Sequence, residues 1–126
     1  MFAGLDLFQI STAMAAHAGR RQALTATNIA NADTPGFRAR TIDGFADLLQ
    51  HAGSPALRQT RPGHLSSSGT TGQAKSHDAG GQAAPNGNTV SLEREMVNAA
   101  RALQEQARAL AIYRHGLSVL RLAGGR

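Results

Sequence analysis

The chain of 126 residues has no cysteine and no tryptophan, and its aromatic residues are limited to four Phe and one Tyr. Without cysteine there are no disulfides and no thiolate metal ligands. Much of the apolar content is alanine, which supports helices but buries little surface. The sequence therefore predicts at most one domain and argues against a large self-contained globule.

Long hydrophobic runs are also missing, because no apolar stretch approaches the roughly 20 residues that cross a bilayer. The start, MFAGLDLFQI, has no basic segment and carries Asp6, so it predicts no cleaved secretory signal. The net charge of +5 comes from scattered arginines, which favours solvated helix faces over a nucleic-acid site. We expect a cytoplasmic protein, or one exported without a cleaved signal.

Residues that could support catalysis or metal binding are few. His51, His64 and His77 are evenly spaced, but they have neither an acidic cluster nor the i, i+4 spacing of a helical metal pair. Asp33 and Asp43 could form a carboxylate pair, but no nucleophile with an orienting base accompanies them. The sequence predicts no enzyme, no metal site, no cofactor and no small-molecule substrate.

The N-terminal part of the chain, from residue 5 to 32, predicts a long helix without proline. Its heptad seam begins apolar and ends polar, and consists of Ile10, Met14, His17, Arg21, Leu24, Asn28 and Asn31. A second stripe is made mostly of small residues: Phe8, Thr12, Ala15, Gly19, Ala23, Ala26 and Ala30. A helix with one row of larger side chains and another row of mostly small ones is expected to pack against several neighbours.

The C-terminal part predicts a helix from 92 to 122, with Ser91 as its N-cap and Gly124 and Gly125 at its end. Two heptad rows run along it: Met96, Leu103, Leu110 and Leu117, interleaved with Leu92, Ala99, Gln106, Tyr113 and Leu120. A seam of this length requires a partner helix of similar length. We expect it to pack on the N-terminal helix.

Between the helices, residues 51 to 88 are rich in Gly, Pro and Ser, and we expect most of this segment to be mobile. Residues 38 to 50 predict a short extended stretch followed by one or two helical turns. The predicted fold class is all-α: the terminal helices form an antiparallel coiled-coil hairpin joined by a largely irregular, flexible middle segment. This divides one assembly domain into residues 1–37, 38–88 and 89–126.

The stretch NIANADTPGF, residues 28 to 37, ends the first helical pattern. Thr34 precedes proline, which disfavours the helical region, so the helix should end by about Ala32. Pro35 and Gly36 fit the centre of a type II turn in which glycine supplies the positive φ. Phe37 then has to find an apolar site beyond the turn.

Three polar residues of this stretch carry further expectations. Asp33 is expected to hydrogen-bond the backbone just past the helix end. Asn28 and Asn31 lie in the helical seam, where asparagine is destabilising unless its amide finds partners. We expect those partners across an interface, where asparagine fixes register and partner choice.

The motif ALTATNIANADTPGF resembles the N-terminal motif shared by bacterial flagellar axial proteins, which are rod, hook and hook-associated subunits. IDGF at 42 to 45, LRQTRPGHL at 57 to 65 and the closing helix are similar to the proximal rod subunits of that family. The short chain, without an inserted outer domain, agrees with that subgroup. One departure is Gly44, where the pattern has Asp directly before Phe.

The resemblance implies a structural subunit of the periplasm-spanning basal-body rod, which transmits torque from motor to hook. It implies that the terminal helices form the inner layer of a tube, with no enzymatic activity and no cofactor. The implied partners are copies of the chain, other rod subunits, components near the membrane ring and the flagellar type III export apparatus.

The residues expected at assembly contacts lie in the turn region and on the C-terminal helix: Leu24, Asn28, Asn31, Asp33, Thr34, Pro35, Gly36, Phe37, Met96, Leu103, Leu110, Tyr113 and Leu117. Two other classes stay open from the residues alone. One is a small basic helical protein that binds nucleic acid or membrane, and the other is a regulatory hairpin that pairs with one partner helix.

Overall fold

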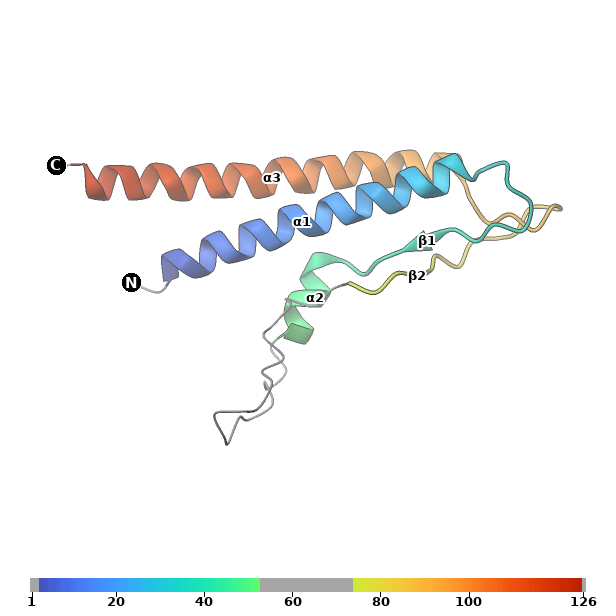
Figure 1. Ribbon diagram of the computed structural model, residues 1–126, viewed down its shortest axis with the longest axis horizontal. Coiled ribbons are helices and arrows are strands. Elements are labelled where there is room, and N and C mark those ends of the chain that lie inside the picture. Colours follow the sequence, from blue (N-terminus) through green and yellow to red (C-terminus); the bar gives the residue numbers. More distant parts are fainter. Residues whose placement is uncertain (1–2, 53–73, 126) are drawn as a thin grey trace, which may run out of the picture.

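Two long helices dominate the computed structural model, which describes residues 3–52 and 74–125. The elements in chain order are α1 (Ala3–Ala30), β1 (Arg40–Thr41), α2 (Phe45–Ala52), β2 (His77–Asp78) and α3 (Leu92–Gly124). Helices α1 and α3 lie side by side and run in opposite directions, so the two termini lie at the same end (Figure 1). The predicted pairing of the two terminal helices is confirmed.

The ends of the helices follow the local signals of the sequence. The hydroxyl of Ser91 accepts a long hydrogen bond of 3.5 Å from the Arg94 N–H, and this caps α3. At the other end, the Gly125 N–H donates to the Arg121 carbonyl at 2.8 Å. Helix α1 stops at Ala30, just ahead of the Thr-Pro-Gly turn. The predicted caps of α3 are confirmed, and the ends of both helices lie within two residues of the predicted ones.

After α1 the chain turns back and forms a short two-stranded ribbon. Strands β1 and β2 are antiparallel, with Arg40 opposite Asp78. The pairing continues beyond the strands, because the Thr89 N–H donates to the Phe37 carbonyl at 3.0 Å. The Thr89 hydroxyl also accepts from the Ala39 N–H at 2.9 Å. These bonds join the segment that leaves α1 to the segment that enters α3.

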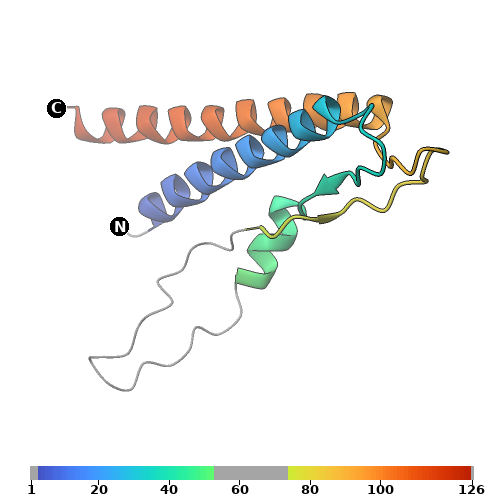
Figure 2. The same cartoon turned by 45° about the vertical axis from the view of Figure 1, so that its right-hand side comes forward.

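The middle of the chain is irregular for most of its described length, as expected, apart from α2 and the two short strands. The predicted extended stretch and helical turns at 38–50 are confirmed as β1 and α2. Residues 74–88 belong to the segment that is expected to be mostly mobile, but they run beside the β1 segment and are bonded to it (Figure 2). The motif LRQTRPGHL and His64 lie outside the described residues.

The buried interior is small in both number and size of side chains. The buried apolar residues of the described chain are Ala18, Ala39, Ile42, Ala102 and Ala109. The buried polar residues are Ser11, His17, Thr25, Asn28, Asn88 and Glu95. Ile42 alone among the former exceeds alanine in size, so hydrophobic burial within the described chain stabilises it only weakly. Polar contacts must set much of the geometry.

Candidate assembly interface

The face of α3 that meets α1 carries one residue from each heptad, and these residues are Glu95, Ala102, Ala109 and Gly116. The face of α1 that meets α3 has the same spacing, with Ser11, Ala18 and Thr25 buried. We call these seven residues the inner seam. Six of the seven are small, and small side chains in register let two helix backbones approach closely.

The apolar row predicted to fill this contact lies elsewhere. Met96, Leu103 and Leu110 are 66%, 53% and 43% exposed, and with the half-buried Leu117 we call them the outer row. The expectation that this row packs on the N-terminal helix is wrong. Each outer-row residue follows an inner-seam residue directly, and one step along a helix turns the side chain by about 100°.

Gly116 shows why the small residues face α1. A Cβ atom added at Gly116 would lie 3.1 Å from Phe8 Cζ and 3.4 Å from a methyl of Leu7. The Phe8 ring also meets Tyr113 edge-on, with ring centroids 5.1 Å apart. A leucine in place of Gly116 would collide with Phe8 and Leu7, so the helices could not approach as they do.

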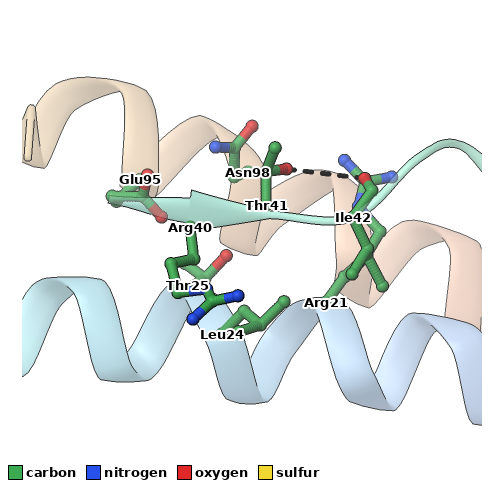
Figure 3. Close-up of a pocket in the computed structure, with 8 residues that line it drawn as sticks. All are labelled: Arg21, Leu24, Thr25, Arg40, Thr41, Ile42, Glu95 and Asn98. Carbon is green, nitrogen blue, oxygen red and sulfur yellow. Dashed lines mark hydrogen bonds between the residues drawn. The ribbon is translucent and has the colours of Figure 1, made fainter. Parts of the chain in front are cut away.

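An ion pair joins the two helices midway along their length. Arg21 on α1 lies 2.7 Å from Glu105 on α3, and both side chains are largely buried. Arg21 belongs to the seam predicted for α1, and so does the half-buried Leu24. Arg21 and Leu24 line a small pocket between α1, β1 and α3, and Glu95 and Ile42 line it too (Figure 3).

The predicted interface asparagine Asn28 is bonded within its own chain. It is 2% exposed, and its amide nitrogen donates to the Arg40 carbonyl at 2.9 Å. Its amide oxygen accepts from the Arg40 N–H at 3.0 Å. Asn28 therefore fixes the register of β1 against α1, and the expectation of partners across an interface is wrong for this side chain.

The bonds of the second asparagine, Asn31, are local and exposed. Its amide nitrogen donates to the Thr27 carbonyl at 2.8 Å, and its oxygen accepts from the Thr34 hydroxyl at 3.3 Å. These bonds satisfy the amide without a partner chain. A role for Asn31 in assembly stays a prediction.

Asn88 has a structural role that the sequence pattern does not indicate. It is 3% exposed, and its amide nitrogen lies 2.8–2.9 Å from the carbonyl oxygens of Asn31, Ala32 and Thr34. It thereby caps the end of α1, which is the role predicted for Asp33. In the described part of the chain the Asp33 carboxylate has no hydrogen bond, so that expectation is wrong. The run Asn-Gly-Asn at 86–88 signals a turn, but it does not reveal a partner more than fifty residues away.

The turn after α1 has the predicted geometry. Gly36 has a φ of +71°, and the Phe37 N–H donates to the Thr34 carbonyl at 3.3 Å, so Pro35 and Gly36 are its central residues. The Gly36 N–H also donates to the Asn86 carbonyl at 3.0 Å. Phe37 is half-buried beyond the turn. The turn is thus tied to the segment that leads into α3.

His17 attaches the chain ahead of α2 to the middle of α1. The ring is buried, and its Nε2 lies 2.9 Å from the Asp43 carbonyl oxygen, which can only accept. The ring also lies 5.6 Å from that of Phe45. Both partners belong to the IDGF motif, so the motif is held against α1 by a polar and an aromatic contact.

An exposed ion pair between Arg38 and Asp78 joins the segment before β1 to strand β2. Arg38 lies 2.9 Å from one Asp78 oxygen, and the Gly80 N–H donates to the other at 2.9 Å. The Gly80 hydrogen bond first, and the Arg38 guanidinium second, lower the pKa of Asp78 below its ordinary value. The pair is solvent-exposed, so its contribution to stability is small.

The described residues offer neither a metal-binding cluster nor a membrane-spanning helix. Residues 3–52 and 74–125 contain no group of three His, Cys, Asp or Glu side chains that could hold a metal ion. In the same residues, no helix is both long and apolar enough to cross a membrane. The arrangement offers contact surfaces: nine of the thirteen large exposed apolar side chains of the described residues lie on α3.

The sequence of the chain is similar to that of flagellar basal body rod proteins. Residues 8–38, which comprise most of α1 and the turn, match the family described as flagella basal body rod protein. The chain is similar to the flagellar basal body rod protein FlgB of Cereibacter sphaeroides, with 33% identity over 105 residues. That match covers 82% of this chain and 81% of the relative.

Two further relatives carry the same description. The Salmonella typhimurium protein is 35% identical over 85 residues, which is 60% of this chain and 62% of the relative. The Agrobacterium fabrum protein is 35% identical over 65 residues, which is 51% of this chain and 48% of the relative. The chain thus spans about half to three fifths of the length of these two relatives.

Proposed function

The chain belongs to the family of flagellar basal body rod proteins named FlgB, and from this premise we propose that it is a structural subunit of the rod. In this role it helps to build the proximal rod, which transmits torque from the motor to the hook. The role requires stable contacts between subunits and involves no catalytic step. The similarity to relatives that are flagellar basal body rod proteins supports it.

The observation that carries the proposal is the outer row of α3. Its apolar side chains recur every seven residues along a helix of 33 residues, and three of them are more than 40% exposed. Fully burying one Leu or Met side chain stabilises a structure by about 1.5–3 kcal/mol relative to leaving it exposed. A continuous apolar row of this length is typical of a helix that packs against a neighbour.

The turn region offers a second surface. Asp33, Thr34, Pro35 and Gly36 are all exposed at the end of the helix pair, next to Asn86. The turn is rigidly held by the bonds described above, so it presents its side chains in a fixed arrangement. We propose that this tip contacts a subunit along the rod axis, while the outer row contacts subunits beside it.

The partners in this proposal are other rod subunits, further copies of the chain and basal-body components near the membrane ring. The flagellar type III export apparatus would deliver the chain to the periplasm-spanning rod. Membership of a basal-body rod family supports both points.

The proposal is tested by replacing the native chain with a tagged version and purifying intact basal bodies. We expect the tagged chain to be present in the rod, and we expect cells without the chain to lack a complete rod and to be non-motile. Complete basal bodies assembled in the absence of the chain would contradict the proposal. Electron microscopy and mass spectrometry of the same preparation provide both readouts.

A further inference from the structure

Glu95 is a buried carboxylate whose charge has no partner in the described chain. It lies in the first turn of α3, it is 4% exposed, and its Oε2 atom has no hydrogen bond. Glu93, two residues earlier, is exposed and already places an acid near the positive end of the helix dipole. A buried carboxylate oxygen without a hydrogen bond is unfavourable, so the position of Glu95 Oε2 requires a further explanation.

Two of the three arginines around Glu95 are bonded elsewhere. Arg21 is paired with Glu105 at 2.7 Å, and Arg40 donates to the Ser76 carbonyl at 3.0 Å. Arg94 lies beside Glu95, but no ion pair joins the two in the described structure. Glu95 therefore has cations nearby without pairing to any of them.

A hollow of about 130 Å³ lies next to Glu95, between the β ribbon and the start of α3. Its lining includes Thr41, Thr89, Ser91, Arg94, Glu95 and Asn98. A cavity of about 10–15 Å³ is enough for one water molecule, so this hollow has room for the four heavy atoms of a guanidinium group. The pocket of Figure 3, on the α1 side, measures only about 10 Å³ and accommodates one water at most.

We propose that an arginine from the α3 helix of a second copy enters this hollow and pairs with Glu95. The inference rests on the proposed function, in which copies of the chain pack together. Arg101 and Arg108 are exposed, recur at the heptad spacing after Arg94, and have no ion pair in the described structure. The chain has 13 basic residues against 8 acidic ones, and 12 of the basic residues are arginine.

The chemistry of the two groups is complementary. A guanidinium offers several N–H donors in a plane and can bond both oxygens of a carboxylate, whereas an ammonium group acts as a point charge. The hydroxyls of Thr41 and Ser91 and the amide of Asn98 line the same hollow and can bond the remaining N–H groups. Copies of a basic chain repel one another, and each such pair would offset part of that repulsion.

The test compares Glu95→Gln with Glu93→Gln, which removes the same charge from an exposed site in the same turn. Self-association of the full chain is measured by sedimentation at low and high salt. We expect Glu95→Gln to raise the dissociation constant about tenfold or more and to weaken its salt dependence, since it removes one member of a buried charge pair. Glu93→Gln should change the constant less than about twofold.

A second variant identifies the partner. Arg101→Gln combined with Arg108→Gln should weaken association to a similar extent, and adding Glu95→Gln should produce little further loss. The urea midpoint of the dilute chain should be unchanged or higher in Glu95→Gln, because a buried unpaired charge has been removed. A lowered midpoint would instead show that Glu95 stabilises the isolated chain.

Other outcomes overturn the inference in distinct ways. Unchanged association of Glu95→Gln would mean that water or solvent ions satisfy the carboxylate. Loss of association in Arg94→Gln alone, with no effect of the Arg101 and Arg108 changes, would assign the pairing to the same chain. Absence of any self-association would exclude a second copy as the occupant, while recovery of the chain in purified basal bodies would leave the rod proposal intact.

Discussion

The inner seam and the outer row run along α3 one residue apart, yet their side chains differ in size and in burial. The inner seam carries Ala102, Ala109 and Gly116 and is buried against α1. The outer row carries leucine and methionine at the same spacing and is largely exposed. A chain that folded for its own stability alone would bury the larger side chains.

The difference supports the proposal that the two surfaces have separate roles, one in folding and one in assembly. Small residues bring α1 and α3 close together, and polar contacts from Arg21, Asn28 and Asn88 set the rotation and register of the pair. The large apolar side chains then remain available for a neighbouring subunit. Under this division, changes in the inner seam should affect folding, and changes in the outer row should affect assembly.

The largest effect is expected for Leu110→Asp in the outer row. A charge in the middle of a subunit contact should prevent rod assembly and abolish motility. Leu110 is 43% exposed in the isolated chain, so the free energy of unfolding should change by less than about 1 kcal/mol. Motility and electron microscopy in a strain without the native chain, with urea unfolding of the purified variant, measure both effects. Gln104→Asp, at an exposed polar site of α3, is the control, and normal swimming of Leu110→Asp would contradict the division.

The next largest effect is expected for Asn28→Leu. The substitution leaves the N–H and the carbonyl of Arg40 without their partners, which should destabilise the chain by about 2–5 kcal/mol. Asn31→Leu makes the same chemical change at a position whose bonds are exposed, and it should destabilise by less than about 1 kcal/mol. Urea denaturation followed by circular dichroism compares the two. Equal losses would show that Asn28 does not anchor β1.

A smaller effect on stability is expected to distinguish the neighbouring positions 102 and 103. Ala102 is fully buried, so Ala102→Leu should force the helices apart and destabilise the chain by about 1–3 kcal/mol. Leu103 is 53% exposed, so Leu103→Ala should destabilise the isolated chain by less than about 1 kcal/mol and should weaken assembly instead. Thermal unfolding of both variants is the measurement. A reversed order of stabilities would place the outer row, not the inner seam, against α1.

The smallest effect concerns pH. The pKa of Asp78 is lowered in the folded chain by the Gly80 hydrogen bond and by Arg38, so its contribution to stability is present at neutral pH. That contribution should disappear as the pH falls below the ordinary aspartate range of about 4 and through the lowered pKa of the folded state. Asp78→Asn should remove this part of the pH dependence. Nuclear magnetic resonance shifts of the β ribbon between pH 2 and 6, roughly the range over which Asp titrates, provide the test.

The local features of the chain were predictable from the sequence by itself. The ends of both long helices, the Ser91 cap, the turn at Pro35 and Gly36, and the short extended stretch with its helical turns all depend on residues close together in the chain. Backbone preferences and capping groups act over a few residues, so their signals are complete within a short window of sequence. The family motif lies in the same stretch, so it too could be identified without the structure.

The tertiary structure alone decided which face of α3 meets α1 and which polar groups hold the pair. Two adjacent heptad rows are equally regular in the sequence, and the choice between them depends on how closely Phe8 and Gly116 can approach. The roles of Asn28 and Asn88, and the burial of Glu95, depend on groups far away along the chain. The rotation of a helix about its axis is set by contacts with its partner, and a pattern along one helix holds no information about the shape of the surface that it meets.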